Sequence, residues 1–428
     1  MHQAICIGFF RSFALDMPRL TTYFFALLFV FMGGCTAVKP TGKQNLAHQY
    51  NSDFPFEVSS RILDAGEDYN LFLEINFKKL TGIQEAAKIW DRYKISYHVS
   101  AGYESRKIIR KDTLGADQRL LPSVNPLVLF LKIPKTFKNQ LVTFSIKENN
   151  GHESFLYDVP VREAEAPGNY EVCLFMRNGR LPIFRNYIQT GDTVVVRKIS
   201  FLNEELDFEF HPFNSSVALP PMAAIPTSGH DFDKAYPVKV VPNQRMVFKE
   251  PGYYFLPSPK GAKQGFGFMV MPPYFPMVST PLELIDPMIY ISTREERKNL
   301  LEASNQKLAL DQFWLKANGQ KNAARKLIKD YFVNVETANR LFSSHKDGWK
   351  TDQGMVAAIY GLPPVVYRSW DLEIWQYEKT ANTENTIFYF SRRPYDKDPN
   401  VWEMKRFNEY DRIWYGVVEL WRKGVINR

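Results

Sequence analysis

The sequence predicts a multidomain protein with two tandem immunoglobulin-like β-sandwiches, followed by a helical C-terminal domain that holds a small antiparallel sheet. Three observations predict this fold class. Short strands with alternating apolar and polar residues fill residues 52–163 and 164–278, where helices have little room. Apolar residues at helical spacing begin only near residue 281. The 428 residues include 33 Phe, 22 Tyr and 8 Trp, which excludes disorder as the main state because several cores can be filled.

The N-terminus predicts export and lipidation. Residues 23–32 are an uninterrupted apolar run, too short to span a bilayer but suited to the hydrophobic part of a signal peptide. Gly33-Gly34-Cys35 follows directly and resembles a bacterial lipoprotein processing site, in which the cysteine is lipidated and becomes the first mature residue. We therefore expect residues 1–34 to be a lipoprotein signal peptide and Cys35 to carry the lipid anchor.

The segment after Cys35 predicts which way the anchored protein faces. Residues 35–51 form a polar tether without an acidic residue, whereas surface-displayed lipoproteins of Bacteroidota resemble one another in an acidic stretch at this place. This difference favours a periplasm-facing anchor. Cys173 is then the only other cysteine of the mature chain, so an intrachain disulfide is excluded. The sequence leaves open whether translation starts at Met1 or Met17.

Residues 52–163 are predicted to form the first β-sandwich. An apolar run ends at Pro134, as expected of a buried strand, and Asn150-Gly151 separates two strands as in a tight hairpin. The predicted strands are residues 71–77, 93–99, 127–133, 142–146 and 155–161.

Residues 164–278 are predicted to form the second β-sandwich, after a linker at 164–168. Asn178-Gly179 predicts a hairpin, and residues 250–255 resemble the corner that enters a late strand of an immunoglobulin-like sandwich, where a tyrosine hydroxyl can bond a backbone group. The predicted strands are residues 170–176, 181–188 and 206–210, and the proline-rich stretch 220–228 is predicted to be a long loop.

Residues 281–428 are predicted to be mainly helical. Thr293 and Glu296 form a capping box that begins a helix extending to about residue 315. Gly424 is expected to end the last helix. The other predicted elements are helices at 322–342 and 409–423 and short strands at 355–360, 373–377 and 386–390.

Within this domain, Gly348-Trp349-Lys350-Thr351-Asp352 resembles the signature of the GWxTD-domain family, which is found mainly in Bacteroidota envelope proteins. The helix before the motif and the segment after it agree with the family over residues 282–428, except that Gln353 stands where the family usually has Arg. The resemblance implies the fold and an envelope location. It implies no reaction, because the family has no established one to transfer.

The motif residues can also be interpreted by their own chemistry. Gly348 can end a helix with a positive φ, Trp349 can fill the junction between helix and sheet, and Thr351 and Asp352 can bond nearby backbone amides. The alternative is functional. In that interpretation Asp352 is a ligand or an acid, with Arg368 or Glu373 as its neighbour.

Other candidate sites are weaker. His230, Asp231 and Asp233 form a possible ligand or cation loop, but they lack a full set of ligands, and a solvated polar loop is the simpler interpretation. Cys173 lies inside an apolar strand and is predicted to be a buried, unreactive thiol. We predict no catalytic residue, no metal and no cofactor. The net charge of +8 is dispersed, and an envelope address excludes nucleic acid as a partner.

The function expected from these observations is that of a non-enzymatic lipoprotein, anchored in the outer membrane and facing the periplasm. It would be an accessory or scaffold subunit of an envelope complex for secretion, gliding or outer-membrane assembly, by analogy with the family. Two alternatives remain open from the sequence. One is an envelope hydrolase with a site around Asp352. The other is a glycan-binding module that exposes Trp370, Trp375 and Trp402 in a row.

Overall fold

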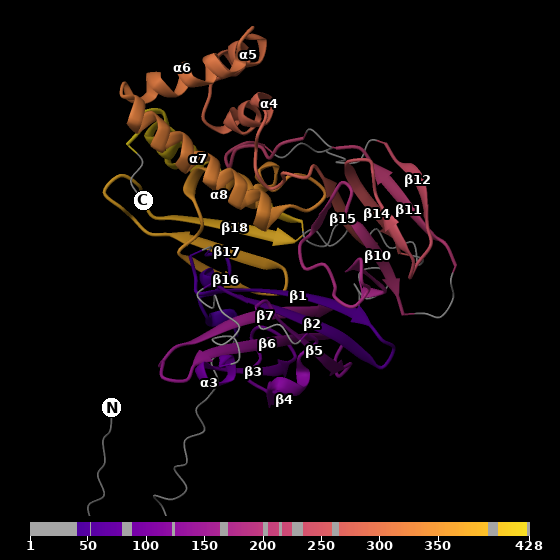
Figure 1. Cartoon of the computed structure of the whole chain (residues 1–428). Coiled ribbons are helices and arrows are strands. Elements are labelled where there is room, and N and C mark those ends of the chain that lie inside the picture. The colour runs from indigo at the N-terminus through magenta and orange to yellow at the C-terminus, as the bar shows by residue number, and fades with distance from the viewer. Residues whose placement is uncertain are drawn as a thin grey trace, which may run out of the picture. The chain divides into compact units, whose positions relative to one another are not determined.

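The computed structural model describes most of the unit Pro40–Arg428. This unit contains two β-rich domains and a C-terminal domain of helices around a small sheet (Figure 1). None of the helices in the described part of the chain has both the length and the apolar character needed to cross a membrane. The described residues are 41–51, 53–78, 88–121, 125–162, 170–199, 204–213, 216–224, 234–258, 265–392 and 401–425.

The first β-rich domain is built from a three-stranded and a four-stranded antiparallel sheet. Apolar side chains from both sheets form one buried cluster, as expected of strands that alternate inward and outward residues. The predicted hairpin at Asn150-Gly151 is confirmed by the pairing of the last two strands. The first sheet has the order β1 (Phe56–Asp64), β2 (Asp68–Phe77) and β5 (Leu127–Pro134), and the second β4 (Ile108–Thr113), β3 (Tyr93–Ser100), β6 (Asn139–Glu148) and β7 (Ser154–Arg162), with short helices α3 (Ile89–Arg92) and η3 (Ala116–Gln118).

The second β-rich domain also has two sheets around a shared apolar cluster. The turn at Gly179 is confirmed, with a φ of 64°, but residues 181–188 are not one continuous strand. Only β9 at their end is a strand, and it pairs in parallel with β15. The Tyr254 hydroxyl donates to the Glu250 carbonyl (3.2 Å), as predicted for the corner. The sheets have the orders β13 (Arg245–Val247), β10 (Thr193–Lys198), β8 (Val172–Met176), and β12 (Tyr236–Val240), β11 (Leu206–His211), β14 (Gly252–Pro257), β15 (Gly265–Met271), β9 (Tyr187–Gln189).

The C-terminal domain packs helices against a four-stranded antiparallel sheet, and α7 and α8 lie over the sheet in Figure 1. Its core contains the fully buried rings of Trp314, Trp375, Trp414 and Trp421. The helices are α4 (Pro281–Ile285), η6 (Asp286–Tyr290), α5 (Arg294–Glu302), α6 (Gln306–Asn318), α7 (Lys321–Phe342), η7 (Gly348–Lys350), α8 (Asp352–Tyr360) and α9 (Tyr410–Arg422), and the strands are β16 (Val365–Arg368), β17 (Leu372–Tyr377), β18 (Thr386–Arg392) and β19 (Trp402–Met404).

Two predictions for this domain are wrong. The helix expected over 293–315 is divided into α5 and α6, because Asn305 caps a new helix by accepting a hydrogen bond from the Leu308 amide. Residues 355–360 are helical rather than a strand, and belong to α8. The capping box at Thr293, the helices α7 and α9, the strands β17 and β18, and the left-handed Gly424 after α9 are confirmed.

The N-terminal part of the described chain is folded against two domains. Residues 41–51, which we assigned to the tether, contain the short helices η1 (Thr41–Lys43) and η2 (Ala47–Gln49). The Leu46 amide donates to the Val366 carbonyl of β16 (2.8 Å), and the Thr41 hydroxyl bonds the Thr143 hydroxyl of β6 (3.1 Å). The chain therefore enters the fold at the junction of the first β-rich domain and the C-terminal domain.

Candidate functional site

The Gly-Trp-Lys-Thr-Asp motif forms the connection between α7 and α8. Gly348 begins the single turn η7, directly against the end of α7. A Cβ at this position would lie 1.9 Å from the Ala338 carbonyl oxygen, so only glycine fits. We predicted a positive φ for Gly348. This prediction is wrong, because Gly348 is not one of the described glycines that have a positive φ. The glycine is required for close backbone approach instead.

Trp349 is buried, as predicted, with 5% of its surface exposed. Its backbone amide donates to the Asn339 side chain of α7 (3.3 Å), and its carbonyl accepts the Tyr290 hydroxyl of η6 (3.2 Å). The Tyr290 ring packs edge-on against the indole at 6.0 Å between centroids. Trp349 therefore ties the motif to two helices by its backbone as well as by its ring.

Thr351 is the N-cap of α8. Its hydroxyl donates to the Gly348 carbonyl (2.7 Å) and accepts from the Gly354 amide (3.0 Å). Both bonds are to nearby backbone groups, as predicted, and the second satisfies an amide that the first turn of a helix leaves unpaired.

The prediction that Asp352 bonds nearby backbone amides is wrong. Its carboxylate accepts the Met404 amide of β19 (2.7 Å) and both terminal nitrogens of Arg406 (2.5 and 3.1 Å). The side chains of Asp352 and Arg406 are each only 8% exposed. A distant strand and a distant arginine thus replace the local turn amides that the sequence suggested.

Arg406 extends this contact to the second β-rich domain. It donates to the Leu219 carbonyl (3.0 Å), and the neighbouring Ala218 amide donates to the Lys350 carbonyl (2.9 Å). The motif therefore joins α7, α8, β19 and the segment 216–224. Within the described residues, Asp352 forms no hydrogen bond with Arg368 or Glu373, the neighbours considered for a catalytic Asp352.

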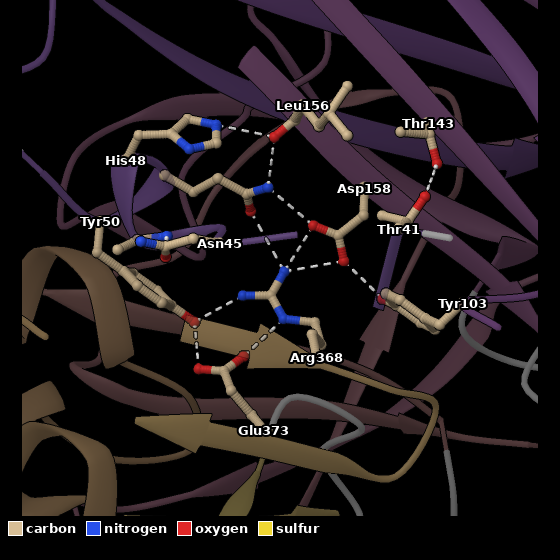
Figure 2. A network of polar contacts seen from close by, with 12 residues as sticks. Thr41, Asn45, His48, Tyr50, Tyr103, Thr143, Leu156, Asp158, Arg368 and Glu373 are labelled. Carbon is tan, nitrogen blue, oxygen red and sulfur yellow. Dashed lines mark hydrogen bonds and ion pairs between the residues drawn. The ribbon is translucent and has the colours of Figure 1, made fainter. Parts of the chain in front are cut away.

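Arg368 and Glu373 belong to a second cluster, which we call the interdomain polar network. Figure 2 shows how Arg368 of β16 lies between two carboxylates that come from different domains. Its guanidinium contacts Asp158 of β7 (2.8 Å) and Glu373 of β17 (2.6 Å). The Asp158 side chain is fully buried and that of Glu373 is 1% exposed. The other members are Gln49, Tyr50, Tyr103, Gln353 and Trp375.

The hydrogen bonds of this network use the lone pairs of both carboxylates. Tyr103 donates to Asp158 (2.5 Å) and Tyr50 donates to Glu373 (2.6 Å). Glu373 also accepts from the Gln353 amide (3.0 Å) and the Trp375 indole (2.6 Å). Gln353 directly follows the motif and stands where the family usually has arginine. Its hydrogen bond to Glu373 thus connects the motif to this network.

The electrostatics favour one fixed protonation state. Burial alone would raise the pKa of the Asp158 carboxyl, but Arg368 and the hydrogen bonds from Tyr103 and Gln49 outweigh it and hold that pKa below its usual value. Burial and the adjacent carboxylates raise the pKa values of Tyr50 and Tyr103 well above the ordinary tyrosine value. The two tyrosines therefore stay protonated donors and Asp158 stays a charged acceptor, which suits a cluster that joins two domains.

The remaining predicted sites have different outcomes. Cys35, His230, Asp231 and Asp233 lie outside the described residues. Cys173 is buried as predicted, and burial raises the pKa of its thiol to about 11. In the part of the chain that the structure describes, no group of His, Cys, Asp and Glu could hold a metal ion.

The three tryptophans proposed for glycan binding do not form an exposed row. Trp375 is fully buried under Phe342 and Phe390. Trp370 is half-buried against Tyr103, and Trp402 is half-buried beneath Arg392. This arrangement removes the feature on which the glycan-binding alternative depended.

Four members of these sites were not predicted from the sequence: Asp158, Tyr103, Tyr50 and Arg406. Asp158 precedes Arg368 by 210 positions, and Asp352 precedes Met404 by 52. A single sequence carries no signal for pairs so far apart. The one available signal was a charged residue inside the otherwise apolar strand at 155–161.

The geometry defines a protein whose C-terminal α+β domain is built around a buried Gly-Trp-Lys-Thr-Asp connection. The family model of the GWxTD domain matches residues 252–423. Residues 252–423 of this chain therefore contain a GWxTD domain. The match begins at Gly252, in β14, so it includes the last two strands of the second β-rich domain as well as the helical region. No curated protein matches the chain in sequence.

Proposed function

We propose that this protein is a non-enzymatic lipoprotein, anchored through Cys35 in the outer membrane and facing the periplasm, that acts as an accessory or scaffold subunit of an envelope complex. Secretion, gliding and outer-membrane assembly are the candidate processes, by analogy with the family. The observation that carries the proposal is which groups the polar side chains of the motif bond. Thr351 and Asp352 both bond groups of the protein itself, so the motif serves the architecture of the domain.

The entry of the chain into the fold supports a scaffold function. Leu46 is fully buried, and Gln49 and Tyr50 bond Asp158 and Glu373. Only a few residues separate Cys35 from this junction, so a lipid on Cys35 would hold the folded protein close to the membrane. A subunit that must keep partners at a fixed distance from a bilayer benefits from such a short connection.

Membrane anchoring is tested by fractionation of cells that express the wild type or Cys35→Ser. We expect the wild type in the outer-membrane fraction, and the variant released to the periplasm or retained as an unprocessed precursor. Unchanged fractionation together with unchanged N-terminal processing would contradict the lipid anchor.

The scaffold function is tested by affinity purification of the tagged full-length protein from native outer membranes. We expect a fixed partner at constant stoichiometry across preparations. Recovery of the protein alone under mild detergent and after chemical crosslinking would contradict this proposal, whatever the outcome for Cys35.

A further inference from the structure

A cavity of about 290 Å³ lies where strands of the two β-rich domains meet the end of β18. Cavities between domains are a common place for small ligands, and this volume is at the small end of their range. The walls are chemically mixed, because aromatic and aliphatic side chains alternate with cationic and amide groups. The residues that the argument uses are Ser60, Arg61, Arg185, Asn186, Phe266 and Arg392.

Arg61 of β1 supplies a half-buried cation to this cavity. It donates to the carbonyl oxygens of Ser60 (2.9 Å) and Ile183 (3.0 Å) and to the amide oxygen of Asn186 (2.9 Å). All three acceptors are neutral, and no ion pair of Arg61 occurs within the described ranges. A guanidinium has five N–H groups, so these bonds leave it capacity for a further acceptor.

The burial of Arg61 also indicates that this side chain can bind an anion. Desolvation lowers the pKa of Arg61, although the charges of Cys173 and Glu74 act against this shift. A cation that has lost water without gaining an adjacent carboxylate is more stable when an anion binds beside it.

Two further arginines line the cavity. Arg392 lines it from β18 and stacks over the Trp402 ring at 5.7 Å, and Arg185 lines it while pairing with Asp192. Asp158 is the one carboxylate among the described lining residues, and Arg368 already neutralises it. Guanidinium groups from β1, from β18 and from residue 185 therefore line the cavity.

We propose that this cavity binds a small organic anion with a phosphate or carboxylate head group. Arg61 and Arg392 contact the anionic oxygens, since guanidinium groups match the geometry of both kinds of head group. The Asn186 amide bonds the same head group, and Phe266 and its apolar neighbours cover the uncharged part of the ligand. This site is separate from the motif and does not depend on the accessory function proposed above.

The test uses the mature protein, from which the signal peptide is absent. Two probes, inorganic phosphate and butyrate, are each titrated in place of chloride at constant ionic strength. Binding is followed as the rise in melting temperature with ligand concentration, from which an apparent Kd is obtained. We expect a saturable rise with at least one probe. A response to phosphate alone, to butyrate alone or to both identifies the head group that the site accepts.

Two variants and a matched control locate the binding. Arg61→Gln and Arg392→Gln should each weaken the apparent Kd by about tenfold or more, because each loses a charge-assisted hydrogen bond. Arg180→Gln, which removes an exposed arginine outside the cavity, should leave the Kd unchanged. If Arg61→Gln does not fold, Arg392→Gln decides alone. The proposal is overturned if neither probe gives a saturable rise, or if the cavity variants bind as tightly as Arg180→Gln.

Discussion

Replacing Asp352 with Asn should destabilise the C-terminal domain by about 3–5 kcal/mol, the usual cost of removing one partner from a buried ion pair. The Asp352 and Arg406 side chains are each 8% exposed, and two of the guanidinium nitrogens lie 2.5 and 3.1 Å from the carboxylate oxygens. Asn can still accept the Met404 amide with its remaining oxygen. It cannot neutralise Arg406, whose other acceptors are the uncharged carbonyls of Leu219 and Met404.

The assay is urea-induced unfolding followed by tryptophan fluorescence, since five buried tryptophans report on the C-terminal domain: Trp314, Trp349, Trp375, Trp414 and Trp421. Asp371→Asn is the matched control. Asp371 pairs with Arg162 at 2.9 Å, but its side chain is 73% exposed, so the same chemical change should cost less than about 1 kcal/mol.

A free energy of unfolding for Asp352→Asn within about 1 kcal/mol of the Asp371→Asn control would contradict this prediction, because a buried arginine without a countercharge should cost more than that. If such a stable Asp352→Asn protein also loses its biological activity, Asp352 acts chemically and the structural interpretation of the motif must be abandoned.

Three further predictions concern the same domain. Gly348→Ala should lower the melting temperature, since its Cβ would overlap the Ala338 carbonyl. Gly416→Ala in α9 should instead stabilise the protein by about 0.5–1 kcal/mol, because no atom lies within 4 Å of the added Cβ. Equal effects of the two substitutions in thermal unfolding would contradict this. Trp414→Ala should cost about 3–5 kcal/mol in urea unfolding, because the ring is buried, and a partner lost with no change in stability would make α9 an interface instead. The hydrogen bond from Arg422 lowers the pKa of Glu296 to about 2 from an unfolded value of 4.5. The stability advantage of the wild type over Glu296→Gln should therefore be complete above pH 4.5 and disappear as the pH falls towards 2. A difference in melting temperature between the two proteins that is constant over this pH window would contradict the prediction.

The sequence predicted the layered organisation because that organisation depends on local patterns. Alternation of apolar and polar residues identified most strands of the first β-rich domain, and helical spacing identified α7 and α9. The capping box at Thr293 was visible because its two partners lie three residues apart. Whether the two β-rich domains are immunoglobulin-like stays a prediction.

The errors arose where local patterns are ambiguous. Residues 355–360 are apolar throughout, and such a short run fits a buried strand as well as a buried helix. Thr351 followed by Asp352 was in fact the start signal of α8, but we interpreted both residues as parts of a turn. The break between α5 and α6 at Asn305 was also a capping signal within a pattern that we treated as continuous.

The contacts that define the two polar sites could not be predicted, because they depend on tertiary structure. Arg368 was considered only as a neighbour of Asp352, yet it pairs with Asp158 on a strand of another domain. Asp352 was assigned short-range bonds because Asp commonly makes them, whereas its partners are Met404 and Arg406. Long-range pairs of this kind follow from how the sheets and helices pack.

The double variant Asp352→Asn/Arg406→Gln distinguishes a motif that supplies architecture from one that supplies chemistry. This change replaces the buried ion pair by two neutral amides. We predict that it recovers at least about 1–2 kcal/mol of the stability lost in Asp352→Asn alone, because no uncompensated charge remains. Complementation of a strain that lacks the protein should recover with it. A double variant that is stable yet fails to complement would contradict an architectural motif, since the carboxylate itself would then be needed.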